Sequence, residues 1–318
     1  MLTLDGVSKT YKIGTFGGKE LHAVSNVSFD VKDGEVVSLI GESGSGKSTI
    51  GKMILRLIST TSGQIVFNGV DVSTLQGEDL KKYYHSVQGV FQDPFSSYNP
   101  IFKADRVFRI IKDEFFPEMT GPEWSDKLER SLKGVGLNPA HVLNKFPHQL
   151  SGGQLQRFLI ARALLLDVQF LVADEIISML DASTRIDVLN LLADLKAGGL
   201  SVLFITHDLS LGYYISERAI ILHRGRVVEM GSTEKIYYNP LHPYTRMLMA
   251  CVPRLDKKWE EAEVETKGRR PETRGCVYYE RCPIAGKNAD CERHNPPLLQ
   301  AEGDHYVACA LSHLGGKA

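Results

Sequence analysis

The segment that most constrains the fold of this chain is Gly41-Glu42-Ser43-Gly44-Ser45-Gly46-Lys47-Ser48-Thr49. It matches the phosphate-binding loop G-x-x-x-x-G-K-S/T at every fixed position. The apolar run at 36–40 precedes it as a buried strand, and residues 49–55 follow it as a helix. The motif requires this context, and we therefore expect an α/β fold around a largely parallel sheet.

The residue types in this loop suit the binding of a polyphosphate with Mg²⁺. Gly41, Gly44 and Gly46 allow the backbone to bend tightly around an anion. Peptide N–H groups and the positive end of the helix dipole then face the phosphates. Lys47 is expected to reach the β- and γ-phosphates, and Ser48 to place its hydroxyl on Mg²⁺. The alternative is a Gly/Ser-rich turn that contains a lysine by chance.

Composition limits the classes of partner. The chain has 318 residues, of which 43% are hydrophobic and 24% charged, and a net charge of -1. That length allows a substantial core, and the charge gives no support for a nucleic-acid partner. Because no run of 18 apolar residues and no secretory signal occur, we expect a cytosolic chain without a membrane span.

The hydrophobic pattern predicts the order of elements. Alternating residues predict antiparallel strands up to about residue 35, and Asn68-Gly69 predicts a hairpin at 64–72. Later segments are a mostly helical region from 78 to about 165, buried strands at 168–173 and 201–206, a helix between them at about 183–196, and a hairpin at 220–229. Strand–helix–strand alternation predicts a parallel sheet covered by helices.

A change of composition after about residue 253 suggests a boundary. A charged stretch from Asp256 to Arg270 leads into a tail with Pro, Gly and Cys and little periodicity. We therefore predict a nucleotide-binding domain at 1–253, with a helical subdomain at about 78–165, and an irregular extension at 254–318.

Other motifs narrow the choice among the many NTPases. Ser151-Gly152-Gly153-Gln154 opens a predicted helix, and Gln92 follows a predicted strand at 87–91. Asp174 and Glu175 end an apolar strand, where Asp174 suits Mg²⁺ and Glu175 is placed to polarise an attacking water. His207 ends the next strand.

Jointly, these motifs resemble the ATP-binding subunit of ABC transporters over residues 1 to about 230. The resemblance implies a P-loop NTPase core with an antiparallel β-subdomain and a helical signature subdomain. It further implies that Tyr11 stacks on adenine and that Gln92 touches Mg²⁺ and the transmembrane partner. Asp174 is then the Mg²⁺ carboxylate, Glu175 the catalytic base and His207 the switch histidine.

The same resemblance implies an ATP site divided between two subunits. Ser151, Gly153 and Gln154 belong to the signature motif, which binds the γ-phosphate of ATP held by the opposite subunit, and Asp181 contacts the dimer partner. A lone monomer is then nearly inactive. Taken singly, each motif has a structural alternative, such as a helix cap at Ser151 or a strand-end histidine bonded to a carbonyl at His207.

One departure from the family pattern follows the catalytic glutamate. Ile176-Ile177 stands where the family usually has Pro-Thr. Two β-branched apolar residues favour a continued strand, which would displace Glu175 and slow this site. Unequal sites in turn favour a partner ATPase that is related but not identical.

Four of the five cysteines lie in the tail: Cys276, Cys282, Cys291 and Cys309. Thiolates in fours bind iron–sulfur clusters or zinc, although the spacing is looser than in C-x-x-C zinc ribbons. For zinc, His294 or His305 could replace a thiolate, and free thiols are a further alternative. Cys251 is expected to be a small core residue near a helix end.

Three segments resemble the oligopeptide/dipeptide branch of ABC importers: 92–100, 239–245 and Arg281-Cys282-Pro283. In that branch the four cysteines hold a 4Fe–4S cluster. We expect such a cluster to crosslink the tail and so to stabilise its structure. The segment from Asp256 to Arg274 lacks the proline-rich run expected before the first cysteine.

The resemblance implies an ATPase subunit at the cytoplasmic face of the membrane. Its partners are a second ABC ATPase, two transmembrane permease subunits and an extracytoplasmic substrate-binding protein. Peptides are the expected substrate, with oligosaccharides as the alternative. Two rivals remain open here: a soluble ABC ATPase of translation or DNA repair, and a subunit that binds ATP without turnover.

Overall fold

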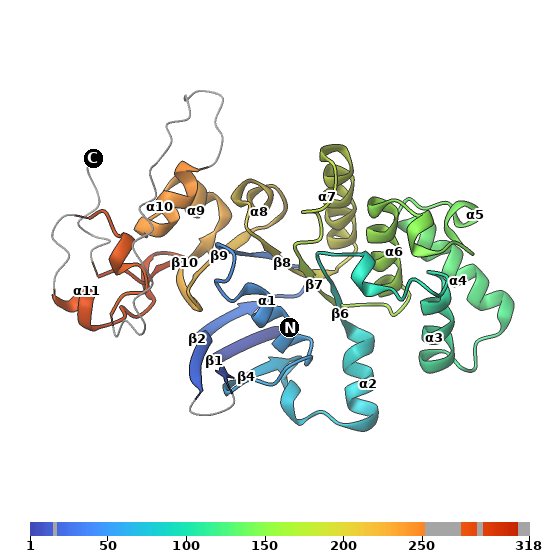
Figure 1. The fold of residues 1–318 in the computed structure, drawn as a ribbon, viewed down its shortest axis with the longest axis horizontal. Helices are drawn as coiled ribbons and strands as arrows, with labels where there is room; N and C mark the ends of the chain where they lie inside the picture. Colours follow the sequence, from blue (N-terminus) through green and yellow to red (C-terminus); the bar gives the residue numbers. More distant parts are fainter. Residues whose placement is uncertain (15–17, 252–274, 285–288, 311–318) are drawn as a thin grey trace. The chain divides into compact units, whose positions relative to one another are not determined.

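The computed structural model describes residues 1–14, 18–251, 275–284 and 289–310 (Figure 1). These residues form two compact units. The first contains residues 1–31, 36–73 and the described residues from 205 onward, and the second contains residues 32–35 and 74–204. The charged stretch at 256–270, and the place of the missing proline-rich run, lie outside the described residues.

The first unit contains a four-stranded antiparallel sheet in the order β2-β1-β4-β5. Its strands are β1 (Leu2–Ile13), β2 (Lys19–Val31), β4 (Ser62–Phe67) and β5 (Val70–Asp71). Asn68 and Gly69 connect β4 to β5 with φ angles of 49° and 83°. Both residues of a type I′ turn need positive φ, and the predicted hairpin is confirmed.

A second set of strands in this unit surrounds the phosphate loop. β3 (Val36–Ile40) is fully buried and runs parallel to β9 (Arg218–His223), which pairs antiparallel with β10 (Arg226–Ser232). The tail adds β11 (Leu299–Glu302) and β12 (His305–Val307), and β12 pairs with β10. The prediction of an irregular tail was therefore wrong at this hairpin, whose strands are too short to show a period.

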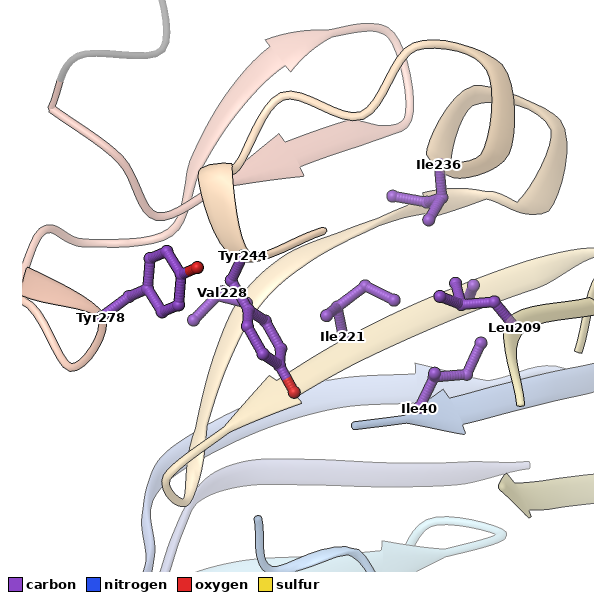
Figure 2. Close-up of a cluster of buried hydrophobic side chains, with 8 residues drawn as sticks. Ile40, Leu209, Ile221, Val228, Ile236, Tyr244 and Tyr278 are labelled. Carbon is purple, nitrogen blue, oxygen red and sulfur yellow. The ribbon is translucent and has the colours of Figure 1, made fainter. Parts of the chain in front are cut away.

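The described helices of the first unit are α1 (Lys47–Ile54), α8 (Leu209–Ile215), α9 (Thr233–Tyr238), α10 (Pro243–Ala250) and α11 (Ala289–Arg293), with the 3₁₀ turn η4 (Tyr279–Arg281). One buried cluster joins Ile40, Leu209, Ala219, Ile221, Val228, Ile236, Tyr244 and Tyr278 (Figure 2). Tyr278 belongs to the tail and is 3% exposed. The tail thus contributes an aromatic side chain to the core of this unit, which favours its attachment.

The second unit is mostly helical. Its strands β6 (Val87–Val90) and β7 (Phe170–Asp174) are parallel, and β8 (Ser201–Thr206) continues from this unit into the first. Its helices are α2 (Gly77–Ser86), α3 (Arg106–Phe115), α4 (Gly121–Gly134), α5 (Pro139–Val142), α6 (Gly152–Leu164) and α7 (Ala182–Ala197). The predicted helical region and the helix between two buried strands are confirmed. Within the described ranges, no helix is both long and apolar enough to cross a bilayer.

Candidate functional site

The phosphate loop connects β3 to α1 in the first unit. Gly44 and Gly46 have φ angles of 77° and 107°, which side-chain-bearing residues rarely adopt. A Cβ at Gly46 would clash with the carbonyl oxygen of Ala23, and one at Gly41 with that of Leu222. Backbone conformation and close packing therefore require these glycines, as the motif predicts.

The loop presents a cation and a helix N-terminus together. Lys47 is 4% exposed, and its Nζ donates to the carbonyl oxygens of Gly41 at 2.7 Å and Glu42 at 3.0 Å. Gly46 caps α1 without a side-chain hydrogen bond, and the first turn of α1 has no acidic residue. No carboxylate in that turn therefore compensates the partial positive charge of the helix end. This charge favours the binding of an anion there.

Tyr11 and His207, also in the first unit, have accessible side chains. Tyr11 lies on β1, is partly exposed and faces Leu21 across the sheet, with the Lys9 ammonium 5.3 Å from its ring centroid. His207 is exposed directly after β8. Both predicted positions, one on a strand ahead of the loop and one at a strand end, are found in the structure.

The signature motif of the second unit forms the N-terminus of α6. Ser151 Oγ accepts from the Gln154 N–H at 3.1 Å, and Gln154 Oε1 accepts from the Ser151 N–H at 2.9 Å. This is a capping box, so the structural alternative for this motif is present in the chain. A Cβ at Gly153 would lie 2.6 Å from Thr184 Cγ2, and glycine is therefore needed there for close packing.

The two carboxylates after β7 occupy different environments. Asp174 ends the strand and is 6% exposed, whereas Glu175 is half-buried with a φ of 50°. The Ser178 N–H and Oγ donate to the Glu175 carbonyl oxygen at 3.1 and 2.9 Å and close a turn. A left-handed residue of this kind costs about 1–3 kcal/mol and is typical of functional sites.

The prediction that Ile176-Ile177 continue the strand was wrong. β7 ends at Asp174, and both isoleucines lie in the turn, 1% and 2% exposed. Their side chains are removed from water within the turn, although the backbone here is not part of a strand. Burial in the tertiary structure therefore outweighs the β-propensity of isoleucine at these two positions.

Asp181 and Gln92 complete the predicted set in the second unit. Asp181 caps α7 and accepts hydrogen bonds from Ser183 Oγ at 2.6 Å, the Thr184 N–H at 3.0 Å and Thr184 Oγ1 at 2.8 Å. The hydrogen bonds from Ser183 and Thr184 hold the pKa of Asp181 well below its ordinary value. Gln92 is exposed after β6.

The candidate residues therefore fall into two groups. The first unit carries Tyr11, the phosphate loop, His207 and the four tail cysteines. The second unit carries Gln92, the signature motif, Asp174, Glu175 and Asp181. Assembly of both groups around one nucleotide stays a prediction.

The four tail cysteines line one pocket, together with His242 and Tyr278. Burial, and more weakly the thiols of Cys309, Cys282 and Cys291, raise the pKa of Cys276 to about 11. In the described part of the chain, however, no three His, Cys, Asp or Glu side chains are grouped closely enough to hold a metal ion. The four cysteines line one pocket, and a metal centre held by them stays a prediction.

Two further predictions about single residues need correction. His305, considered as a zinc ligand, is 1% exposed, and its Nε2 lies 2.7 Å from Glu229 Oε1. That nitrogen is occupied by a buried carboxylate. Cys251 lies at the end of α10 as predicted, but it is exposed rather than a core residue.

Sequence reasoning missed two side chains that contact the phosphate loop. Arg281 donates from Nη1 and Nη2 to the two carboxylate oxygens of Glu42, each at 3.0 Å. The Glu42 N–H donates to the Tyr244 hydroxyl at 3.0 Å. These partners are 239 and 202 residues from Glu42, so no local pattern could have indicated them.

Comparisons with known proteins agree with this arrangement. The ABC transporter family model matches residues 24–178, and the model of the oligopeptide/dipeptide transporter C-terminal region matches residues 228–291. The oligopeptide transport ATP-binding protein AppF of Bacillus subtilis is 40% identical, with 98% of this chain and 97% of AppF covered. OppF of Salmonella typhimurium is 36% identical, with 92% and 88% covered.

Solved structures show the same fold. The dimeric ATP-binding cassette MJ0796, bound to ADP and Pi after hydrolysis, matches with a TM-score of 0.66 at 33% identity. The match covers 73% of this chain and 99% of that cassette. The predicted class, a P-loop NTPase fold with antiparallel and parallel sheets, is confirmed.

Proposed function

Because the chain belongs to the ABC transporter family of ATP-binding subunits, in its oligopeptide/dipeptide branch, we propose that it powers the uptake of peptides through separate membrane subunits. The observation that carries this proposal is the combination of an intact phosphate loop with relatives that match nearly the whole chain. The matches to known proteins include the C-terminal region of this chain as well as its ATP-binding part. This favours a peptide importer over a non-transport ABC ATPase.

The residues of the phosphate loop fit ATP. The glycines leave space where side chains would clash, and Lys47 supplies a buried ammonium. Lys47 is proposed to donate to the β- and γ-phosphates. Ser48, Gln92 and Asp174 are the proposed Mg²⁺ ligands, since hydroxyl, amide and carboxylate oxygens suit this cation. Mg²⁺ held there would neutralise phosphate charge.

Hydrolysis is assigned to Glu175 and His207. Glu175 accepts a proton from the attacking water, and its left-handed backbone, with a φ of 50°, is of the kind found at functional sites. His207 orients the same water or the γ-phosphate. The buried turn at Ile176-Ile177 differs from the family's Pro-Thr, and this difference favours a related but non-identical ATPase as the partner subunit.

The signature motif acts on a second subunit's nucleotide. The α6 N-terminus carries Ser151 and Gly153, and the capping box orders it before ATP arrives. Asp181 is ionised through its Ser183 and Thr184 hydrogen bonds and presents a charge at the start of α7 for the partner ATPase. ATP binding between two such subunits favours their closure.

The region after Gln92 is the proposed contact with the permeases. Phe95, Ile101 and Phe102 are 46%, 76% and 43% exposed, which is unusual for large apolar side chains in one segment. Two permease subunits and an extracytoplasmic substrate-binding protein complete the importer. Binding to permeases places this chain at the cytoplasmic face of the membrane.

For the four cysteines we propose a 4Fe–4S cluster, with zinc as the alternative. The support is that all four thiols line one pocket and that sulfur donors in fours suit either metal centre. No step of the transport cycle is assigned to it. Anaerobic purification followed by visible absorbance and by iron, sulfide and zinc analysis tests this assignment. Loss of visible absorbance in Cys282→Ser supports the cluster, whereas protein without iron, sulfide or zinc contradicts both metals.

Uptake in cells that carry Lys47→Ala tests the proposed function. Labelled di- to pentapeptides and labelled oligosaccharides are supplied side by side, and Lys82→Ala, exposed on α2, serves as a control. Loss of peptide uptake alone supports the proposal. If only sugar uptake is lost, the substrate assignment is wrong, and if neither changes, a non-transport ATPase is favoured.

A further inference from the structure

We propose that Arg281 and Tyr244 are positioning residues for the phosphate loop, and that the C-terminal extension thereby sets the affinity of this chain for ATP. The inference rests on the proposed function in one respect, that the loop binds ATP. Its observations all lie within the first unit.

Glu42 is held at three points. Its carboxylate receives both Arg281 nitrogens at 3.0 Å, its N–H donates to the Tyr244 hydroxyl at 3.0 Å, and its carbonyl oxygen accepts from Lys47 Nζ at 3.0 Å. Lys47 also donates to the neighbouring carbonyl of Gly41. Since Glu42 and Gly41 locate the ammonium, a shift of Glu42 moves the cation that meets the phosphates.

Tyr244 is a rigid anchor. It is 0% exposed, and its ring centroid lies 4.2 Å from that of His223 and 5.4 Å from that of Tyr278. Figure 2 shows Tyr278 of the tail beside Tyr244 of α10. Burial raises the pKa of Tyr244, so its hydroxyl stays neutral and keeps its place as acceptor for the loop.

Arg281 connects Glu42 to the cysteine pocket. It ends the 3₁₀ turn η4 and precedes Cys282, and its guanidinium carbon lies 5.7 Å from the Tyr278 ring centroid. The Tyr279 N–H donates to the Cys276 carbonyl at 3.0 Å, which places a second pocket cysteine at the start of the same turn. A displacement of this turn is therefore transmitted to Glu42 through two parallel hydrogen bonds.

The ion pair also has an electrostatic purpose. An unpaired carboxylate in the second position of the loop would repel polyphosphate, and Arg281 neutralises it. The hydrogen bond to Glu42 raises the pKa of Arg281, which keeps the guanidinium charged at any pH relevant to cells. Because the pair is planar and bidentate, lysine can replace the charge but not the geometry.

The test is the ATP affinity of the full chain, measured by calorimetry, together with KM and kcat for ATP in the assembled transporter. We expect Arg281→Ala to weaken ATP binding about three- to tenfold, as partial exposure limits the strength of the pair. Arg281→Lys should fall between wild type and Arg281→Ala. KM should rise while kcat stays within about twofold.

Lys235→Ala is the matched control. Lys235 also connects the tail to the rest of the unit, through Asp304 at 2.7 Å and the Glu302 carbonyl at 3.2 Å, and neither of these residues belongs to the phosphate loop. We expect its ATP affinity to equal that of wild type. If Lys235→Ala weakens ATP binding as much as Arg281→Ala does, the effect is general loosening of the tail and the proposal is overturned.

A double-mutant cycle gives the decisive comparison. With Glu42 already changed to Ala, removal of Arg281 should cause no further loss of affinity, because the two side chains act as one unit. Additive losses overturn the proposal, as does wild-type affinity in folded Arg281→Ala. Wild-type protein that fails to bind ATP would refute the proposed function instead. If Arg281→Ala does not fold, the ATP affinity of Arg281→Lys is compared with that of wild type in its place.

Discussion

Replacement of Glu229 by glutamine should destabilise the first unit strongly. Glu229 lies on β10 and is 0% exposed. Its Oε1 accepts from the Leu241 N–H at 2.7 Å and lies 2.7 Å from His305 Nε2, while its Oε2 accepts from the His242 N–H at 2.9 Å. One carboxylate thus joins β10 to β12 and to the N-terminus of the helix that carries Tyr244.

The magnitude follows from these three contacts. Glutamine keeps one oxygen, so its NH₂ group must face at least one N–H donor inside the protein. One buried donor left unsatisfied, together with weaker hydrogen bonds to a neutral acceptor, costs about 2–4 kcal/mol. For a chain of 318 residues the loss corresponds to a decrease in Tm of about 3–6 °C.

Thermal unfolding at neutral pH, followed by circular dichroism, measures this effect. Glu234→Gln is the matched control, because Glu234 is exposed on α9 and should change stability by less than about 0.5 kcal/mol. ATP affinity measured on the same samples reports on α10 and the loop. If Glu229→Gln unfolds at the same temperature as Glu234→Gln, the network around Glu229 does not stabilise the fold and the reasoning is refuted.

Three further predictions concern the nucleotide site and its supports. In a transporter whose partner ATPase has been made catalytically inactive, Glu175→Gln should leave ATP binding intact but slow the remaining ATP hydrolysis about 10²–10⁴-fold, and unchanged turnover there would show that another group is the base. Gly46→Ala should abolish ATP binding in calorimetry because its φ of 107° and the Ala23 carbonyl exclude a Cβ, and retained binding would contradict this geometry. Asp181→Asn should lower Tm at neutral pH, since the folded-state pKa is depressed and the ionised cap stabilises α7 above the ordinary carboxyl pKa of about 3.9. The difference between the two proteins should shrink as the pH falls below that value, and a difference independent of pH would argue against an ionised cap.

The elements that could be predicted from sequence are those with local causes. The phosphate loop was identified because glycines, lysine and flanking elements are contiguous, and the structure shows that Gly44 and Gly46 need positive φ. The turn at Asn68-Gly69 was predictable for the same reason. The buried strands β3, β7 and β8 appear as short, mostly apolar runs.

The features that escaped prediction depend on tertiary contacts. The four residues of β11 are all exposed, so no apolar alternation marked the tail hairpin. Ile176-Ile177 have the local preference of a strand, but burial and the left-handed Glu175 place them in a turn. The contacts of Glu42 with Arg281 and of Glu229 with His305 join residues far apart in the chain, and charge at one position does not indicate its partner.

Coupling of ATP hydrolysis to peptide import can be measured in a transporter reconstituted in vesicles, with this chain, its partner ATPase, the permeases and the substrate-binding protein. We expect hydrolysis to rise when peptide-loaded binding protein is added, peptide to accumulate in the compartment that holds the ATPases, and both effects to be lost in Lys47→Ala. Hydrolysis that is indifferent to peptide, with no peptide movement, would contradict the proposed function.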